Sequence, residues 1–170
     1  MAVTVIAGIS RARQAEVLRW QLFTRATPLT RVGFARASQG KGYMHTLSAS
    51  LESVAPGLVE IALTPGSAVS QQHGFVHAGA LAAIADSAAC YAALSLMPPG
   101  AGVLTIEFKI NLLAPAAGER ILARGRVIKA GRTLTLAQTE VFSQTAGQEK
   151  LVALLTATLM TVEGQEGVND

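Results

Sequence analysis

The chain has 170 residues, of which 50% are hydrophobic and only 5% aromatic, and its formal net charge is +3. This length suits one domain with a substantial core, and the composition is that of a folded protein and excludes a disordered one. Its basic residues are scattered along the chain, which argues against a nucleic-acid-binding surface. The single cysteine excludes an intramolecular disulfide and favours a reducing cytoplasm.

The first part of the chain has helical periodicity. Apolar residues recur at helical spacing from Arg11 to Ala26, where Pro28 stops the pattern, and a second short helical piece is expected from Thr30 to Ser38. We assign residues 1–40 to an N-terminal helical extension. Met1–Ser10 is mildly apolar but has no basic start, so we do not interpret it as a signal peptide.

Six later segments alternate between apolar and polar residues, as half-buried strands do. The first two, 46–52 and 58–63, are joined by the turn Ala55-Pro56-Gly57 and predict a hairpin. The clearest is the third, 104–112, in which Leu104, Phe108 and Leu112 are expected on one face. The remaining predicted strands are 121–128, 133–143 and 151–162. Short turns between them favour antiparallel neighbours.

One long helix is predicted between the second and third strands. It follows the loop that starts at Gln71, runs from His77 to Met97, and is stopped by Pro98 and Pro99. Asp86 is its only charged residue, and the helix is otherwise apolar on every side, so we expect it to be buried on every side. A membrane span is disfavoured, because nearly half of the segment is alanine and a carboxylate lies at its middle.

These elements predict an α+β fold in which one antiparallel sheet wraps around one long central helix, because the helix needs apolar cover and each strand offers one apolar face. We place this domain at residues 41–162 and expect a disordered tail at 163–170.

The buried carboxylate is the first indication of function. Taking an ion out of water costs several kcal/mol, so Asp86 needs either strong hydrogen-bond donors or a role that uses a perturbed pKa. A structural alternative is an acid that hydrogen-bonds Ser87 or a neighbouring backbone group. Cys90, one turn later, is most simply a small buried apolar residue.

The motif His73-Gly74-x-x-His77-x-Gly79, followed by Asp86, resembles the hotdog-fold acyl-CoA thioesterases of the PaaI-like family. The likeness extends over roughly residues 40–162 and includes Val103–Pro115, which is similar to the family's third strand and its closing proline. It implies a hydrolase that cleaves an acyl-CoA thioester to a free acid and CoA. It also implies a homo-oligomer, either a dimer or a tetramer.

The resemblance also implies site residues. Asp86 falls on the family's catalytic carboxylate, Gln71 on its usual Asn, and Thr105 on its Ser or Thr of the following strand. Where many members have His-Gly-Gly, this chain has His77, Ala78 and Gly79. The helix start supplies unpaired N–H groups and a positive dipole end, so an oxyanion is expected to bind there, with Ala78 N–H as donor. His73 and His77 have an alternative role as packing residues that orient the loop.

Helix geometry places His77 and Asp86 about 13 Å apart along the axis and roughly half a turn round it. The two cannot serve one carbonyl within one chain. We therefore hypothesise a composite site, in which one subunit contributes Gln71, Gly74, His77 and Ala78 and its neighbour contributes Asp86 and Thr105.

CoA phosphates need cations, and four basic residues cluster around one predicted hairpin: Arg124, Arg126, Lys129 and Arg132. The alternative is that these four residues are ordinary solvated side chains of an exposed hairpin. No cysteine and histidine cluster has metal-ligand spacing, so no metal is expected, and CoA enters as part of the substrate, with no separate cofactor.

The alternatives are a second enzyme activity on the same fold and a non-catalytic function. A hydratase or dehydratase acting on acyl thioesters is a rival within the same fold, but it needs a His and carboxylate pairing that we do not find. A non-catalytic acyl-CoA-binding or sensing module would bind thioesters without turnover. The acyl group is left open, as is the choice between CoA and an acyl-carrier protein.

Overall fold

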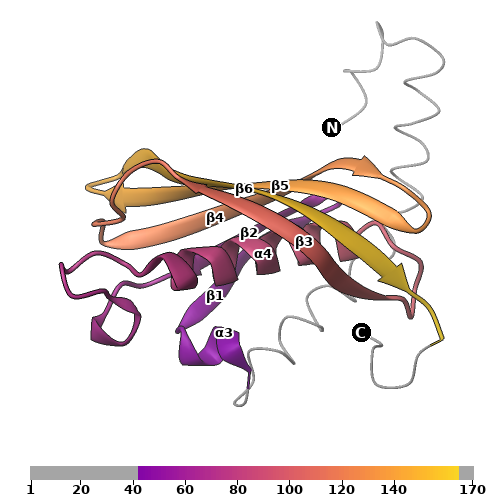
Figure 1. The fold of residues 1–170 in the computed structure, drawn as a ribbon, viewed down its shortest axis with the longest axis horizontal. Coiled ribbons are helices and arrows are strands. Elements are labelled where there is room, and N and C mark those ends of the chain that lie inside the picture. The colour runs from indigo at the N-terminus through magenta and orange to yellow at the C-terminus, as the bar shows by residue number, and fades with distance from the viewer. Residues whose placement is uncertain (1–41, 165–170) are drawn as a thin grey trace, which may run out of the picture.

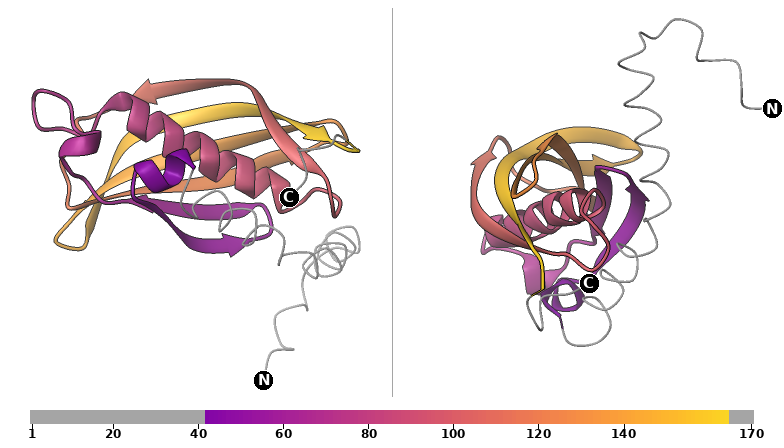
Figure 2. Two further views of the ribbon diagram at one scale, coloured as in Figure 1. Left: turned by 90° about the horizontal axis from the view of Figure 1, so that it is seen from below. Right: turned by 90° about the vertical axis from the view of Figure 1, so that its right-hand side faces the viewer.

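A computed structural model describes residues 42–164. The expected arrangement is confirmed: one antiparallel sheet of six strands wraps around one long helix, α4 (Ala78–Leu94) (Figure 1). The sheet has the strand order β1-β2-β4-β5-β6-β3. The end-on view in Figure 2 shows the sheet curving around the helix. The predicted helical extension, residues 1–40, lies outside the described residues, as do residues 165–170 of the predicted tail.

The strands follow the predicted pattern, with longer bounds for most. They are β1 (Ala49–Ala55), β2 (Leu58–Leu63), β3 (Gly102–Leu112), β4 (Arg120–Ala130), β5 (Leu134–Thr145) and β6 (Gln148–Val162). A short 3-10 helix, η2 (Ser67–Val69), lies between β2 and α4. Every pair of neighbouring strands is antiparallel.

The prediction that the first strand begins at Thr46 is wrong. Residues Tyr43–Thr46 form a short helix, α3, and the strand begins at Ala49. Met44 and Leu47 are both buried, which matches the three-residue spacing of one helix face. Ser48 then turns the chain with a φ of 52° before β1 starts.

Helix α4 packs directly on the sheet at one turn. A Cβ atom at Gly125 of β4 would lie 2.5 Å from the backbone carbonyl of Ala88, so only glycine lets the helix backbone approach this closely. On the neighbouring strand, the buried Thr139 hydroxyl donates to the carbonyl of Ala85 at 2.9 Å. These contacts fix the turn 85–88 against β4 and β5.

The expectation that α4 is buried on every side is wrong within one chain. Its sheet-facing residues are buried, but one stripe along the helix, which includes Ala82, Asp86 and Cys90, is only half-buried. The helix also ends at Leu94, three residues before Met97, where Ser95 donates its hydroxyl to the carbonyl of Ala92. This otherwise apolar helix therefore leaves the face that carries Asp86 incompletely covered.

Strand β3 departs from its predicted alternation, because a bulge interrupts it between Thr105 and Glu107. Leu104 pairs with Met160, whereas Phe108 pairs with the buried Ala157, so the bulge puts Leu104 and Phe108 on opposite faces of the sheet. β3 is also an edge strand, and four of its apolar side chains are exposed: Leu104, Ile106, Phe108 and Leu112.

Candidate active site

The start of α4 is capped by the side chain of His77. His77 has an extended backbone, with φ −64° and ψ 138°, and its Nδ1 accepts a hydrogen bond of 2.9 Å from the N–H of Gly79. Its carbonyl accepts hydrogen bonds from the N–H groups of Ala80 and Leu81. Within residues 42–164, the N–H of Ala78 is therefore the one of the first four helix donors that no acceptor engages.

The loop before the helix is closed by its own backbone. Gln71 N–H donates to the carbonyl of Phe75 at 2.8 Å, and Gly74 N–H donates to the carbonyl of Gln71 at 3.0 Å. Gly74 has a φ of +81°, a left-handed conformation that favours glycine. The role of Gly74 is thus to shape the loop that presents Gln71 and His77.

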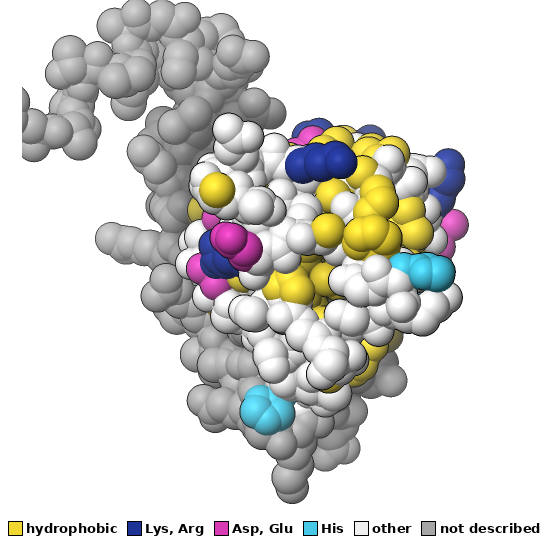
Figure 3. Space-filling model, turned by 90° about the vertical axis from the view of Figure 1, so that its left-hand side faces the viewer, with side chains coloured by type: hydrophobic (Ala, Val, Ile, Leu, Met, Phe, Trp, Pro, Cys, Tyr) yellow, Lys and Arg dark blue, Asp and Glu magenta, His cyan; other side chains and the backbone are white. Residues whose placement is uncertain are grey.

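A pocket of about 520 Å³ lies between this loop, the first turn of α4 and the segment after β3. Three polar side chains of the loop line it, Gln71, His73 and His77. The other lining residues are apolar: Phe75, Val76, Ala78, Leu81, Leu112, Leu113, Ala114, Pro115 and Ala116. Figure 3 views this end of the molecule, where hydrophobic side chains form a continuous area with histidine and basic side chains at its margins. The pocket brings together three of the predicted site residues, Gln71, His77 and Ala78, whereas Gly74 belongs to the same loop but does not line the pocket.

The other two predicted site residues meet elsewhere. The Thr105 hydroxyl donates to Asp86 Oδ1 at 2.8 Å, which joins β3 to the middle of α4. Thr105 pairs in register with the buried Leu159, so it lies on the helix-facing side of the sheet, just before the bulge. Burial raises the pKa of Asp86, and the hydrogen bond from Thr105 offsets part of that increase. Ser87, the partner in the structural alternative, makes no hydrogen bond to this carboxylate in the described residues.

Cys90 belongs to the same cluster. Its Sγ lies 3.1 Å from Thr105 Oγ1. Because the single hydroxyl proton of Thr105 is directed to Asp86, the thiol is the donor in this contact. Burial raises the pKa of Cys90 to about 12, and the charge of Asp86 adds to the effect. Cys90 is therefore a protonated side chain that contacts Thr105. The sequence interpretation of Cys90 as a simple apolar residue missed this contact. The signal that could have found it is the spacing of one helical turn, which puts Cys90 on the same helix face as Asp86.

The pocket at the helix start and the Asp86 cluster are separate within one protomer. Neither Asp86 nor Thr105 lines the pocket that holds Gln71 and Ala78. The nine-residue step from His77 to Asp86 corresponds to about 13 Å of helix. One chain therefore contains two incomplete halves of the predicted site.

The four basic residues predicted to bind CoA differ in their surroundings. Arg124 forms ion pairs with Glu60 at 2.6 Å and Glu149 at 3.3 Å, and its guanidinium lies 4.9 Å from the centre of the Phe142 ring. Arg126 donates to Gln138. Lys129 and Arg132 are exposed at the hairpin between β4 and β5.

Two further properties concern only the described part of the chain. No three His, Cys, Asp or Glu side chains in it are grouped so that they could hold a metal ion. No helix in residues 42–164 is long and apolar enough to cross a membrane.

Comparison with known proteins gives a consistent set of similarities. The sequence model of the thioesterase superfamily matches residues 73–150. A thioesterase family protein from Silicibacter pomeroyi is 46% identical in sequence, with 79% of this chain and 96% of that chain covered and a TM-score of 0.75. No match was found among the curated proteins.

More distant structures share the fold. The PaaI protein of the Escherichia coli phenylacetic acid degradation operon has a TM-score of 0.71 at 22% identity, with 82% of this chain and 98% of that chain covered. The thioesterase HI1161 from Haemophilus influenzae has a TM-score of 0.71 at 19% identity, with 79% and 91% covered. These identities support the architecture alone.

Proposed function

Since the chain belongs to the thioesterase superfamily, we propose that this thioester hydrolase cleaves an acyl-CoA to a free acid and CoA. The observation that carries the proposal is the half-buried Asp86 carboxylate, held at 2.8 Å by Thr105 in the middle of an otherwise apolar helix. A carboxylate whose pKa is raised by burial is a better base than an exposed one, which suits the activation of water.

The carbonyl of the thioester would be polarised at the start of α4. Ala78 N–H is free to donate, and it stands at the positive end of the helix dipole, where negative charge on the carbonyl oxygen is stabilised. Gln71 lines the same pocket and would position the carbonyl or the attacking water. His77 contributes by capping the helix, which keeps the first turn in place.

Asp86 would act in one of two ways. As a general base it takes a proton from water, whose oxygen forms a bond to the carbonyl carbon while the C–S bond breaks and the thiolate is protonated. As a nucleophile its oxygen bonds to that carbon while the C–S bond breaks and CoA leaves as a thiolate that takes a proton from solvent. Water then hydrolyses the mixed anhydride to the free acid and restores the Asp86 carboxylate. In both cases Thr105 orients the carboxylate.

Both mechanisms need the two half-sites to meet, and we propose that they meet across a dimer. Strand β3 is a long sheet edge whose exposed apolar side chains include Ile106 at 53% and Phe108 at 46% exposure. Such an edge is suited to pairing with a second copy. A two-fold axis at β3 would bring the helix start of one subunit toward Asp86 of the other.

The tetramer implied by the family resemblance would need a second contact. The outer face of the sheet offers three exposed leucines for it, Leu104, Leu134 and Leu136. We also propose a cytoplasmic location, which is inferred from the single cysteine. Contacts with CoA are proposed for four basic residues: Arg124, Arg126, Lys129 and Arg132.

Thiol release from a panel of aliphatic and aromatic acyl-CoAs tests this function, with wild type and Asp86→Asn measured in parallel. We expect the variant to lose about 10²–10⁴-fold in kcat, because the amide cannot accept a proton or attack. Glu140→Gln, on the outer face of β5, makes the same chemical change away from both half-sites and should keep full activity. Circular dichroism checks that both variants fold.

Absence of wild-type turnover on every acyl-CoA, together with measurable equilibrium binding of those esters, would favour the non-catalytic binding module. An Asp86→Asn variant with wild-type kcat would also contradict the proposed role of this carboxylate.

A further inference from the structure

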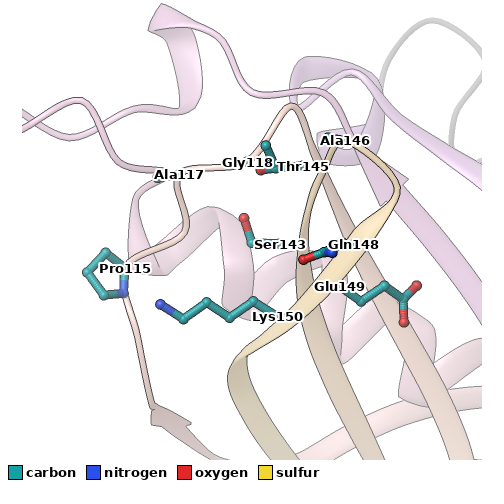
Figure 4. A pocket seen from close by; sticks show the side chains of 9 residues that line it. All are labelled: Pro115, Ala117, Gly118, Ser143, Thr145, Ala146, Gln148, Glu149 and Lys150. Carbon is teal, nitrogen blue, oxygen red and sulfur yellow. The ribbon is translucent and has the colours of Figure 1, made fainter.

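A second pocket, of about 580 Å³, lies at the same end of the molecule as the first. It is formed by the segment after β3 and by the hairpin that joins β5 to β6, as Figure 4 shows. Pro115 lines both pockets, and the next residues continue from one into the other, since Ala116 lines the first and Ala117 the second. The two pockets are therefore neighbours along one short stretch of chain.

Lys150 is the cation of this second pocket. It pairs in register with Ser143, which is buried on the helix-facing side of the sheet, so Lys150 lies on that side as well. Figure 4 shows its side chain extending toward Pro115. No hydrogen bond or ion pair with another residue of 42–164 engages its ammonium group, so the charge is available to a ligand.

The acidic neighbour of Lys150 does not cancel this charge. Glu149 pairs with Gln144 and turns away from Pro115 (Figure 4). Its carboxylate accepts hydrogen bonds from the guanidinium of Arg124 and from Gln144, at 3.3 Å and 2.9 Å. Glu149 is thus engaged in a network with Arg124 and Glu60 and is directed away from Pro115, whereas Lys150 supplies the positive charge that faces Pro115.

Gly118 brings the wall of the pocket close to β5. A Cβ atom at this position would lie 2.4 Å from the carbonyl oxygen of Gln144 and 2.5 Å from Ser143 Oγ. Glu119 N–H also donates to the Gln144 carbonyl at 2.8 Å. The segment after β3 is thus held against the end of β5, which gives the pocket a fixed shape with Ser143, Thr145 and Gln148 as further polar lining residues.

We infer that this pocket binds the phosphate at the end of the pantetheine arm of the thioester substrate, with Lys150 as the cation. The inference rests on the proposed function, because it places the thioester in the first pocket and the carrier's phosphate in the neighbouring one. A lysine ammonium binds phosphate as a point charge, and hydroxyl and amide groups supply further donors. CoA and acyl-carrier proteins both carry this phosphate, so the inference names the chemistry they share.

Steady-state kinetics on three substrates with one acyl group tests the inference: acyl-CoA, the acyl-carrier-protein thioester, and acyl-pantetheine, which has no phosphate. For Lys150→Met we expect KM to rise about five- to tenfold on a phosphate-bearing substrate, with kcat and the kinetics of acyl-pantetheine unchanged. Lys150→Arg keeps the charge and should restore most of the affinity. Lys109→Met removes a lysine from the outer face of β3 and serves as the matched control.

The inference is supported if the KM of Lys150→Met rises on acyl-CoA, on the carrier-protein substrate, or on both, but not on acyl-pantetheine. The substrate whose KM rises identifies the source of the phosphate. An unchanged KM on both, or an equal loss on acyl-pantetheine, overturns it. If the wild type turns over none of the three substrates, the proposed function fails, and equilibrium binding of CoA to wild type and Lys150→Met then decides the inference separately. Weaker CoA binding by the variant would support it, and equal binding would overturn it.

Discussion

The start and the middle of helix α4 carry opposite chemistry. At the start, Ala78 offers an N–H that no acceptor in residues 42–164 engages, beside an apolar pocket, whereas at the middle Asp86 offers a carboxylate that accepts a hydrogen bond from Thr105. Each region lacks what the other supplies, and the helix itself holds them too far apart to cooperate. In the proposed dimer, one helix would therefore contribute to two sites, an oxyanion donor to one and a base to the other.

Separation of the subunits should have the largest effect on this arrangement. Phe108→Glu places a carboxylate on the exposed edge of β3, where two copies would repel each other across a two-fold axis. We expect a folded monomer with thiol release reduced by about 10³-fold, because neither half-site is then complete. Light scattering gives the molar mass. Tyr43→Glu, at an exposed position of α3, is the control and should keep both the oligomer and the activity. A fully active monomer would refute the composite site.

Removing the donor at the helix start should have the next largest effect. Ala78 is the first residue of α4 and His77 before it is extended, so Ala78→Pro fits the backbone while deleting the N–H. We expect kcat to fall about 10²–10³-fold, as for the loss of one oxyanion donor. Ala78→Ser keeps the N–H and is the control. Equal kcat in the two variants would exclude this N–H from catalysis.

Mixing the two inactive variants sharpens the same test. If Ala78→Pro and Asp86→Asn subunits exchange at random, half of the dimers are mixed and one site in each is intact, so about a quarter of wild-type activity should return. Mixtures that stay inactive after subunit exchange would show that both groups act within one chain.

The smallest expected effect concerns pH. Catalysis needs the Asp86 carboxylate, so kcat/KM should fall as pH decreases through the raised pKa of this group. The hydrogen bond from Thr105 lowers that pKa, so Thr105→Val should move the acid limb of the profile to higher pH, with a loss below about tenfold on the alkaline plateau. An unmoved acid limb would show that the limiting proton belongs to another group.

The sequence predicts the fold well because its signals are local. The alanine-rich run to Leu94 indicates a helix, and the alternation within each strand indicates a sheet, without any knowledge of the partners. The position of Asp86 in this helix likewise follows from the sequence alone. What the sequence does not show is which strand lies at the edge, so the exposure of Phe108 and the bulge at β3 come only from the pairing with β6.

The site was predicted less completely for a similar reason. The sequence does not show which N–H groups at the helix start already have an acceptor, and the N–H of Gly79 is bound by His77 Nδ1. Lys150 resembles any solvated hairpin residue in the sequence, next to Glu149. Only the pairing of Glu149 with Arg124 and the register with Ser143 distinguish it.

The turn 85–88 is held against the sheet by the close contact of Gly125 with Ala88 and by the hydrogen bond from Thr139 to the carbonyl of Ala85. The turn that carries Asp86 is anchored to the rigid middle of the sheet, whereas Leu81 and the segment Leu112–Ala116 that shape the acyl pocket lie beyond that anchor. If this pocket holds the acyl group, as proposed, substitutions there should alter the preferred acyl group without displacing the carboxylate. Selectivity and reactivity would then depend on separate parts of one small domain.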